Sequence, residues 1–154
     1  MKNTLTALMV VVAGLSWSLA PRAHADKAKK ATGALLVPAT DIKWTDVPGM
    51  AGVQTFAVEG DPSKGPSHFF IKFVAGFSAP LHHHTVNHYV TVVAGTLLLT
   101  VDGKEQKLPP GSFFSFSDKT KHSTACAAGA DCVLSIDARG KWDVIMETDK
   151  TVKK

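Results

Sequence analysis

The sequence predicts an all-β domain of the sandwich or barrel class, and three observations support this prediction. After residue 25 the apolar runs are short, rich in Val, Phe, Thr and Leu, and separated by Gly, Pro and Asp, as expected for half-buried strands. Asp102-Gly103 separates two such runs, which is a strong hairpin signal. No apolar run beyond residue 25 combines helix length with a 3.6-residue period. Short strands joined by regular turns are typical of sandwiches and barrels.

The predicted strands follow one another between turn signals. Pro48-Gly49, Gly60-Asp61-Pro62 and Pro109-Pro110-Gly111 mark turns in addition to Asp102-Gly103. The runs between these turns are enriched in β-branched and aromatic residues, which fit a pleated, half-buried surface. In chain order the predicted strands cover residues 34–37, 42–45, 53–59, 67–74, 82–84, 88–93, 96–101, 105–108, 112–116, 122–127, 132–137 and 142–146.

The chain begins with the features of a secretory signal. Lys2 gives a positive start, the apolar stretch that follows is too short to span a bilayer comfortably, and Ala23-His24-Ala25 matches a small-x-small cleavage site. We expect a cleaved signal peptide at 1–25, a flexible, solvated arm at 26–32 and a single β-domain at 33–150. An uncleaved membrane anchor is the alternative for the first segment. Cleavage would give a periplasmic or secreted protein with no stable membrane insertion.

The charge pattern gives no indication of a nucleic-acid partner. The chain has 17 basic and 13 acidic residues and a net charge of +4. Loss of Lys2 and Arg22 with the signal would reduce this net charge to about +2. The lysines lie near the chain ends and in turns rather than in a patch interleaved with aromatic residues. We therefore expect a small-molecule partner and no nucleic acid.

Cys126 and Cys132 are the two cysteines, and both lie in the predicted mature chain. Export to an oxidising compartment permits a disulfide, and Ala128-Gly129 between them is typical of a turn. We favour a bridge that closes a hairpin. The alternative is a free thiol at Cys126 that faces the neighbourhood of His122, where it could bind a metal or be oxidised.

Histidines form the most informative pattern of the sequence. His82, His84 and His88 lie in the pattern G-x5-H-x-H-x3-H-x6-G, and His122 opens a later predicted strand. Side chains alternate between the two faces of a strand, so His82 and His84 should share a face while His83 points away. A turn before His88 would bring it beside this pair. If the faces line a common interior, His82, His84, His88 and His122 can bind one metal ion.

Imidazole is a ligand for Fe, Cu, Ni and Zn, and it binds them at neutral pH without a charge of its own. Four histidines would leave the charge of a divalent metal uncompensated, and such a site favours an added anionic ligand. A solvated surface run is the alternative for residues 82–84 taken alone, but the framing glycines and His122 argue against it. His68 is expected to be structural or to lie at the cavity mouth rather than to be a ligand.

These residues resemble the cupin superfamily. Its first motif, G-x5-H-x-H-x3,4-E-x6-G, is matched at Gly76, His82, His84 and Gly95, with His88 where most cupins have glutamate. Its second motif, G-x5-P-x-G-x2-H-x3-N, is matched at Gly111 and His122 only. The Pro, Gly and Asn positions of this second motif hold Ser117, Lys119 and Cys126.

The resemblance implies a single-domain jelly-roll β-barrel or sandwich with one divalent transition metal (Fe, Mn, Cu, Ni or Zn) in its mouth. It also implies a homodimer as the expected assembly. The change from glutamate to His88 removes the carboxylate that could act as a general base and raises the charge of the site by one unit. This favours redox or Lewis-acid chemistry.

The resemblance leaves three functions open. The first is a metal-dependent, dioxygenase-like oxidoreductase that acts on a small organic substrate. The second is a non-catalytic periplasmic protein that binds a metal or ligand, and the third is a Zn- or Mn-dependent lyase or isomerase. No catalytic residue is assigned. The residues expected to line an apolar cavity beside the metal, with ordinary core packing as the alternative for most of the phenylalanines, are Phe70, Phe73, Phe114, Phe116, Val90 and Thr124.

Overall fold

The computed structural model describes residues 33–147 of the chain. The predicted signal peptide (1–25), the predicted arm (26–32) and the last residues of the predicted domain (148–150) lie outside this range. A compact unit begins at Val37 and contains all the strands found within residues 33–147. Within residues 33–147, no helix is long and apolar enough to cross a membrane.

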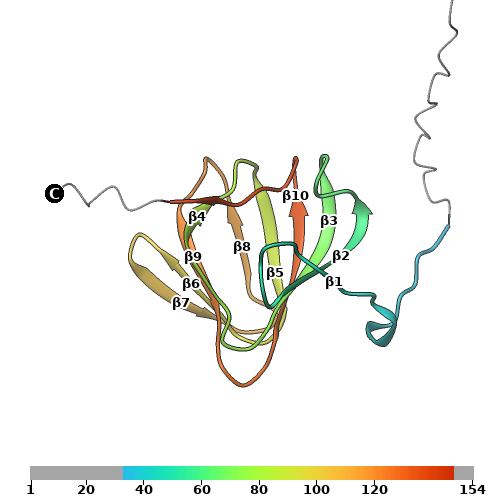
Figure 1. The fold of residues 1–154 in the computed structure, drawn as a ribbon, viewed down its shortest axis with the longest axis horizontal. Helices are drawn as coiled ribbons and strands as arrows, with labels where there is room; N and C mark the ends of the chain where they lie inside the picture. The colour runs from blue at the N-terminus through green and yellow to red at the C-terminus, as the bar shows by residue number, and fades with distance from the viewer. Residues whose placement is uncertain (1–32, 148–154) are drawn as a thin grey trace, which may run out of the picture. The chain divides into compact units, whose positions relative to one another are not determined.

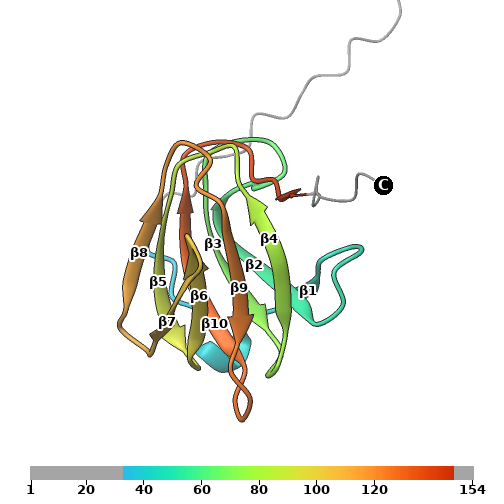
Figure 2. The ribbon, with the colours of Figure 1, turned by 90° about the vertical axis from the view of Figure 1, so that its left-hand side faces the viewer.

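Two antiparallel sheets face each other, which confirms the predicted all-β jelly-roll fold (Figure 1). The first sheet has the order β1 (Thr45–Asp46), β2 (Val53–Gly60), β3 (Ser67–Phe73), β10 (Cys132–Ala138), β5 (His88–Ala94) and β8 (Phe113–Phe116). The second has the order β11 (Ile145–Met146), β4 (Ser78–His83), β9 (His122–Cys126), β6 (Leu97–Val101) and β7 (Lys104–Leu108). The only helical element of the described residues is the 3-10 turn η1 (Ala39–Asp41). Figure 2 shows that β4 and β5, consecutive in the chain, lie in different sheets.

The predicted strand at 34–37 is wrong. No strand forms there, and the side chains of Leu35 and Leu36 are 63% and 86% exposed. An apolar run has strand propensity, but a strand also needs a partner for its backbone hydrogen bonds. The run ends at Pro38, whose ring nitrogen has no hydrogen to donate, and the chain then turns into η1.

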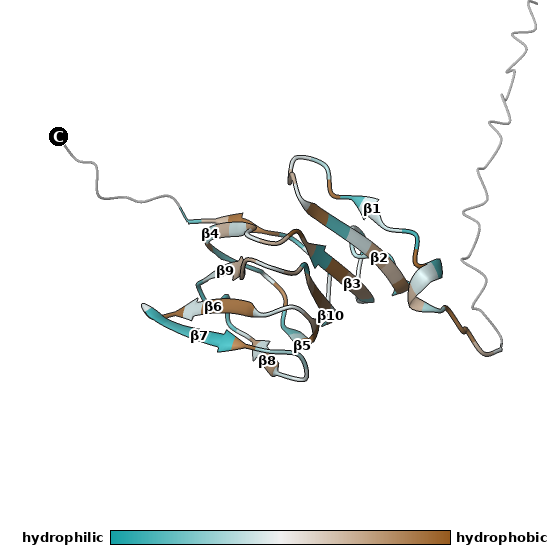
Figure 3. Cartoon of the chain, turned by 90° about the horizontal axis from the view of Figure 1, so that it is seen from below, coloured by the Kyte–Doolittle hydropathy of each residue, from teal (hydrophilic) through white to brown (hydrophobic). Residues whose placement is uncertain are grey.

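The core lies between the two sheets, because every second residue of the central strands points inward. In β5 and β10 the buried residues alternate with exposed or half-buried ones. Figure 3 colours the ribbon by hydropathy: hydrophobic stretches of the central strands such as β3 and β10 are brown, whereas β7, at the edge of its sheet, is mostly hydrophilic. The core contains Val53, Phe69, Ile71, Phe73, Val90, Val92, Leu97, Leu134 and Ile136.

The Asp102-Gly103 hairpin is confirmed between β6 and β7. Both residues have positive φ angles, 49° and 74°, as the tight turn of a two-residue hairpin requires. Val101 pairs with Lys104 directly across this turn.

Cys126 and Cys132 form a disulfide that joins the end of β9 to the start of β10. The predicted bridge is therefore present, but the prediction that it closes a hairpin is wrong, because β9 and β10 belong to different sheets and do not pair with each other. The bridge instead ties the two sheets together. Both cysteines are buried.

Loss of this bridge should lower stability moderately. The closed loop is short, so the chain-entropy model gives about 2 kcal/mol. We expect the Cys126→Ala/Cys132→Ala double variant to lose about 2 kcal/mol in urea unfolding relative to the oxidised protein, and to be insensitive to dithiothreitol. An unchanged free energy of unfolding would show that the bridge is not a stabilising element.

Candidate metal centre

Four histidines meet at one end of the space between the sheets. His82 lies in β4, His84 directly follows that strand, and His88 opens β5 of the opposite sheet. His122 opens β9 and is the direct partner of His82 across the β4–β9 ladder. The ends of three strands therefore bring the four side chains together, and all four are at least 93% buried.

Three of the four form a tight cluster. The candidate ligand atoms of His82, His84 and His122 lie within 4.8 Å of one another. The ring centroids of His82 and His122 are 4.3 Å apart. His88 adjoins this cluster through His84, at a centroid distance of 4.8 Å. The structure thus brings the predicted four-histidine set together as a close triad and a neighbouring fourth imidazole.

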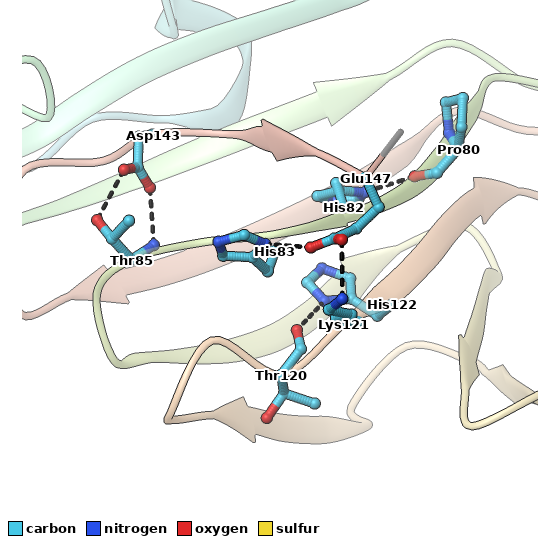
Figure 4. A network of polar contacts seen from close by, with 9 residues as sticks. All are labelled: Pro80, His82, His83, Thr85, Thr120, Lys121, His122, Asp143 and Glu147. Carbon is cyan, nitrogen blue, oxygen red and sulfur yellow. Dashed lines mark hydrogen bonds and ion pairs between the residues drawn. The ribbon is translucent and has the colours of Figure 1, made fainter. Parts of the chain in front are cut away.

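Each of these imidazoles has its Nδ1 atom on a backbone carbonyl. A carbonyl oxygen only accepts hydrogen bonds, so Nδ1 carries the proton and Nε2 keeps its lone pair. A metal-binding histidine is fixed in the same way, with one ring nitrogen donating to a carbonyl and the other facing the metal. Figure 4 shows two of these bonds, at His82 and His122. The acceptors are Pro80 for His82 (2.7 Å), Asp143 for His84, Val86 for His88 (3.0 Å) and Thr120 for His122 (2.9 Å).

Burial keeps these imidazoles neutral. Desolvation lowers the pKa of His84 to about 3 and that of His122 to about 4, although the bonds to the carbonyls of Asp143 and Thr120 oppose the shift. Desolvation also lowers the pKa values of His82 and His88. A neutral imidazole with a free Nε2 lone pair is the form that binds a metal. The donor set, its protonation and its clustering therefore fit a divalent transition metal.

The segment that follows β10 completes the site, and sequence analysis assigned it no such role. The ring of Trp142 stacks on His84 at a centroid distance of 4.0 Å and meets His88 edge-on at 5.0 Å. Asp143 accepts hydrogen bonds from the backbone N–H of Thr85 (2.8 Å) and from its hydroxyl (2.7 Å) through its carboxylate. Burial raises the pKa of Asp143, but the lowering effects, led by the hydrogen bonds from Thr85, outweigh it and the pKa is lowered overall. The segment was predicted as a strand at 142–146, and only Ile145–Met146 is one.

Removal of the Asp143 carboxylate should weaken metal binding. It fixes the turn between His84 and His88, and the backbone carbonyl of the same residue orients His84. We expect Asp143→Ala to reduce metal affinity by about 10- to 100-fold, measured by competition with a chromogenic chelator. Asp137→Ala is the matched control, because Asp137 pairs with Arg139 at 2.9 Å and does not line the cavity. Wild-type affinity in Asp143→Ala would contradict this supporting role.

His83 lies outside the cluster and takes part in a different network. Its Nδ1 atom is 2.7 Å from the Glu147 carboxylate, which also accepts a hydrogen bond from Lys121 at 2.8 Å (Figure 4). Hydrogen bonds from Lys121 and then His83 lower the pKa of Glu147. Glu147 thus links β4 to the residue before β9. His68 is exposed and 2.8 Å from the Ser135 hydroxyl, away from the cavity.

A cavity of about 790 Å³ extends from the histidines between the two sheets. Of the residues predicted to line it, Phe73, Phe114, Val90 and Thr124 do so. Phe70 does not, because it lies on the opposite face of β3 from the buried residues Phe69, Ile71 and Phe73. Phe116 does not line the cavity either, but its ring stacks on His122 at a centroid distance of 4.3 Å.

Comparison with known proteins accounts for this combination of fold and histidines. Residues 69–138 match the family model of the cupin domain (Cupin_2). These residues form a domain of the cupin superfamily. The match begins within β3, ends with β10 and includes all four clustered histidines of this cupin. No curated protein sequence matches the chain significantly.

Solved structures share the cupin fold at low sequence identity. The polyketide cyclase RemF from Streptomyces resistomycificus aligns with a TM-score of 0.63 and 18% identity over 77% of this chain and 89% of its own. KdgF from Halomonas sp. aligns with a TM-score of 0.57 and 23% identity over 70% of this chain and 94% of its own. A predicted oxalate decarboxylase from Thermotoga maritima aligns with a TM-score of 0.56 and 17% identity over 68% and 98%. At these identities the likeness concerns the fold alone.

Proposed function

We propose that this cupin is a metal-dependent oxidoreductase of the dioxygenase type that acts on a small organic substrate. One observation carries the proposal: four buried, neutral imidazoles with free Nε2 lone pairs face an apolar cavity. When bound there, a divalent Fe, Mn, Cu or Ni ion supplies redox and Lewis-acid chemistry. His82, His84 and His122 would hold it, with His88 as the fourth ligand.

The described residues of the cavity offer no free carboxylate that could act as a general base. Asp143 is the only carboxylate among those that line it. Its oxygens already accept two hydrogen bonds from Thr85, and its lowered pKa makes it a weak base. Reactions that depend on proton abstraction by a protein carboxylate are therefore disfavoured. This supports redox chemistry over the isomerase and lyase alternative.

The protein itself would position the metal ligands and exclude water from the site. The backbone carbonyls orient the imidazoles, and Trp142 and Phe116 pack against them from two sides. Such packing fixes the geometry of the ligands before a substrate arrives. The apolar walls keep the substrate in a low-dielectric environment, where its interaction with a positive centre is stronger than in water.

Elemental analysis of the protein purified from its native compartment, followed by oxygen uptake with diketones, flavonols and catechols, tests the proposal. We expect about one redox-active metal per chain and substrate-dependent oxygen consumption. Absence of turnover with every redox metal would overturn it. Zinc as the native metal would favour a lyase or isomerase, and tight, exchangeable metal without turnover would favour a carrier or sensor partner.

The cellular setting stays a prediction. We propose that the protein works in the periplasm or outside the cell after cleavage behind Ala25, and the Cys126–Cys132 disulfide supports an oxidising compartment. Mass spectrometry of the exported protein tests the cleavage site. The homodimer also stays a prediction, and light scattering of the purified protein tests it.

A further inference from the structure

We infer that the cavity accepts a weak acid with a single ionisable group at one end and an uncharged, largely apolar body. This inference rests on the proposed metal site and names the substrate class for it. Three features of the cavity carry it: the composition of the wall, the absence of basic side chains from that wall among the described residues, and the cluster of four histidines at one end.

The wall away from the histidines is apolar. The first sheet contributes inward-facing apolar side chains, among them Ile71 of β3, Val90 of β5 and Leu134 of β10. The rings of Phe73 and Phe77 stack in parallel with centroids 4.8 Å apart. Binding an apolar ligand against this wall removes apolar surface from water, which is favourable. The same wall offers few hydrogen-bond partners for the hydroxyl groups of a ligand. Sugars and other polyhydroxylated molecules are therefore poor candidates.

No basic side chain lines this wall among the described residues. Two lysines of neighbouring segments are engaged elsewhere: Lys72 lies over the ring of Trp44, and Lys121 is paired with Glu147. The one charged carboxylate in the lining, Asp143, would repel a second negative charge. A phosphate or carboxylate on the body of a substrate would lose its water without gaining a partner. Phosphorylated sugars and dicarboxylic acids are thereby excluded.

The histidine end favours the opposite kind of group. His82, His84, His88 and His122 each have Nδ1 on a backbone carbonyl, so each would offer an uncharged Nε2 donor and leave the charge of a bound divalent metal uncompensated. An oxygen donor that becomes negative, such as a phenol, an enol or a single carboxyl group, would compensate it. The head group thus lies at the histidines, and the body extends between the sheets.

The volume of the cavity sets the size of the apolar body of the substrate. About 790 Å³ lies within the range of small-molecule sites, which bury most of their ligand. A body of one or two rings, or an aliphatic chain of similar size, fits this space.

The inference is tested by binding without turnover. The probes are 4-tert-butylbenzoate and terephthalate, which share a benzoate head and differ in an apolar or a charged far end. Isothermal titration uses the zinc-loaded protein, since zinc is not redox-active. We expect 4-tert-butylbenzoate to bind at least about tenfold more tightly than terephthalate. Equal or tighter binding of terephthalate, or no binding of either probe, would overturn the inference.

A charge placed in the wall provides the matched variant. Met50 is half-buried and lines the cavity, so Met50→Arg should bring the two affinities to within about threefold of each other or invert them. Val93→Arg adds the same charge at an exposed position outside the cavity and should keep the wild-type ratio. An unchanged ratio in Met50→Arg, with the fold verified by circular dichroism, would count against the cavity as the binding site.

Failure of the inference and failure of the proposed function are distinguishable. Selective binding of 4-tert-butylbenzoate without oxygen uptake under any redox metal would remove the oxidoreductase and leave the substrate class in place. Oxygen uptake with dicarboxylic or phosphorylated substrates would leave the oxidoreductase and overturn the substrate class.

Discussion

Replacing His122 with alanine should lower the affinity for a divalent metal by about two orders of magnitude. Structural zinc sites with four protein ligands bind with about 10–16 kcal/mol, which is about 3 kcal/mol per ligand, and 1.4 kcal/mol corresponds to a factor of ten. His122 belongs to the close triad and is 98% buried, so water cannot easily replace it. Competition with a chromogenic chelator, using Zn²⁺ or Co²⁺, measures the change.

The matched control is His83→Ala. His83 stands between two of the proposed ligands in the chain, but its Nδ1 atom is engaged with Glu147 outside the cavity. This variant should keep its affinity to within a few-fold, whereas a loss as large as that of His122→Ala would contradict the assignment. His88→Ala tests the fourth ligand and should also bind metal much more weakly. Full affinity in that variant would reduce the site to the triad of His82, His84 and His122.

The all-β class and the shared face of His82 and His84 could be predicted because both follow from local rules, whereas the jelly-roll fold and its four-histidine site are implied by the resemblance to cupins. Alternation along a strand separates His82 from His83, and the same alternation puts Val90 and Val92 on the inward face that begins at His88. The Asp102-Gly103 turn has its own sequence signature. In each case the information lies within a few residues, and no partner strand is needed to apply it.

The assignment of Phe70 to the cavity wall is wrong, although the same rule of alternation along a strand excludes it. Phe70 and Phe73 are three residues apart, so in a regular strand they face opposite sides and only one of them can line the cavity. Phe70 shares its face of β3 with His68 and Lys72, whereas the other face is wholly apolar from residue 69 to residue 73, so the alternation already favours that other face as the inward one. Pairing with β2 and β10 in the first sheet fixes Phe69, Ile71 and Phe73 as the buried set.

The roles of Trp142 and Asp143 could not be predicted because they depend on a return of the chain. The segment after β10 passes over the histidines before β11 pairs with β4, so residues about 60 positions apart become neighbours. No local pattern signals this.

The second cupin motif shows the opposite situation, in which the local backbone persists although the motif residue has changed. Lys119 stands where the family has glycine and still adopts a left-handed φ of 56°. The backbone that presents His122 is thus retained although the sequence signal is lost.

Acid should destabilise the metal-free protein by about 4 kcal/mol between about pH 7.5 and about pH 5. The ordinary pKa of histidine is 6.5, and burial lowers it to about 3 in His84 and about 4 in His122. Below pH 6.5 the unfolded chain therefore binds protons that the folded chain does not, and stability falls as the pH falls. At about pH 5 each of these groups contributes a loss of about 2 kcal/mol. His82 and His88 shift in the same direction and add to the effect.

Carboxylates do not explain a loss in this window. Asp143 and Glu147 have pKa values below their ordinary values of 3.8 and 4.5. A lowered carboxyl pKa gives stability that is fully present above the ordinary value and is lost only below it, toward the folded value. Their contribution therefore disappears at a lower pH than the contribution of the buried imidazoles, and the two effects are separated by the choice of pH.

Urea unfolding of the chelator-treated protein at the two pH values measures the loss. His84→Gln removes one buried imidazole and should reduce the pH-dependent difference by about 2 kcal/mol, even if its stability is lower at both pH values. His68→Gln changes an exposed histidine and should keep the wild-type difference. Equal free energies of unfolding at the two pH values would mean that the imidazoles are not held neutral. A metal that binds only the folded protein stabilises it, and only neutral imidazole binds a metal. Protonation of the imidazoles therefore weakens this stabilisation as the pH falls.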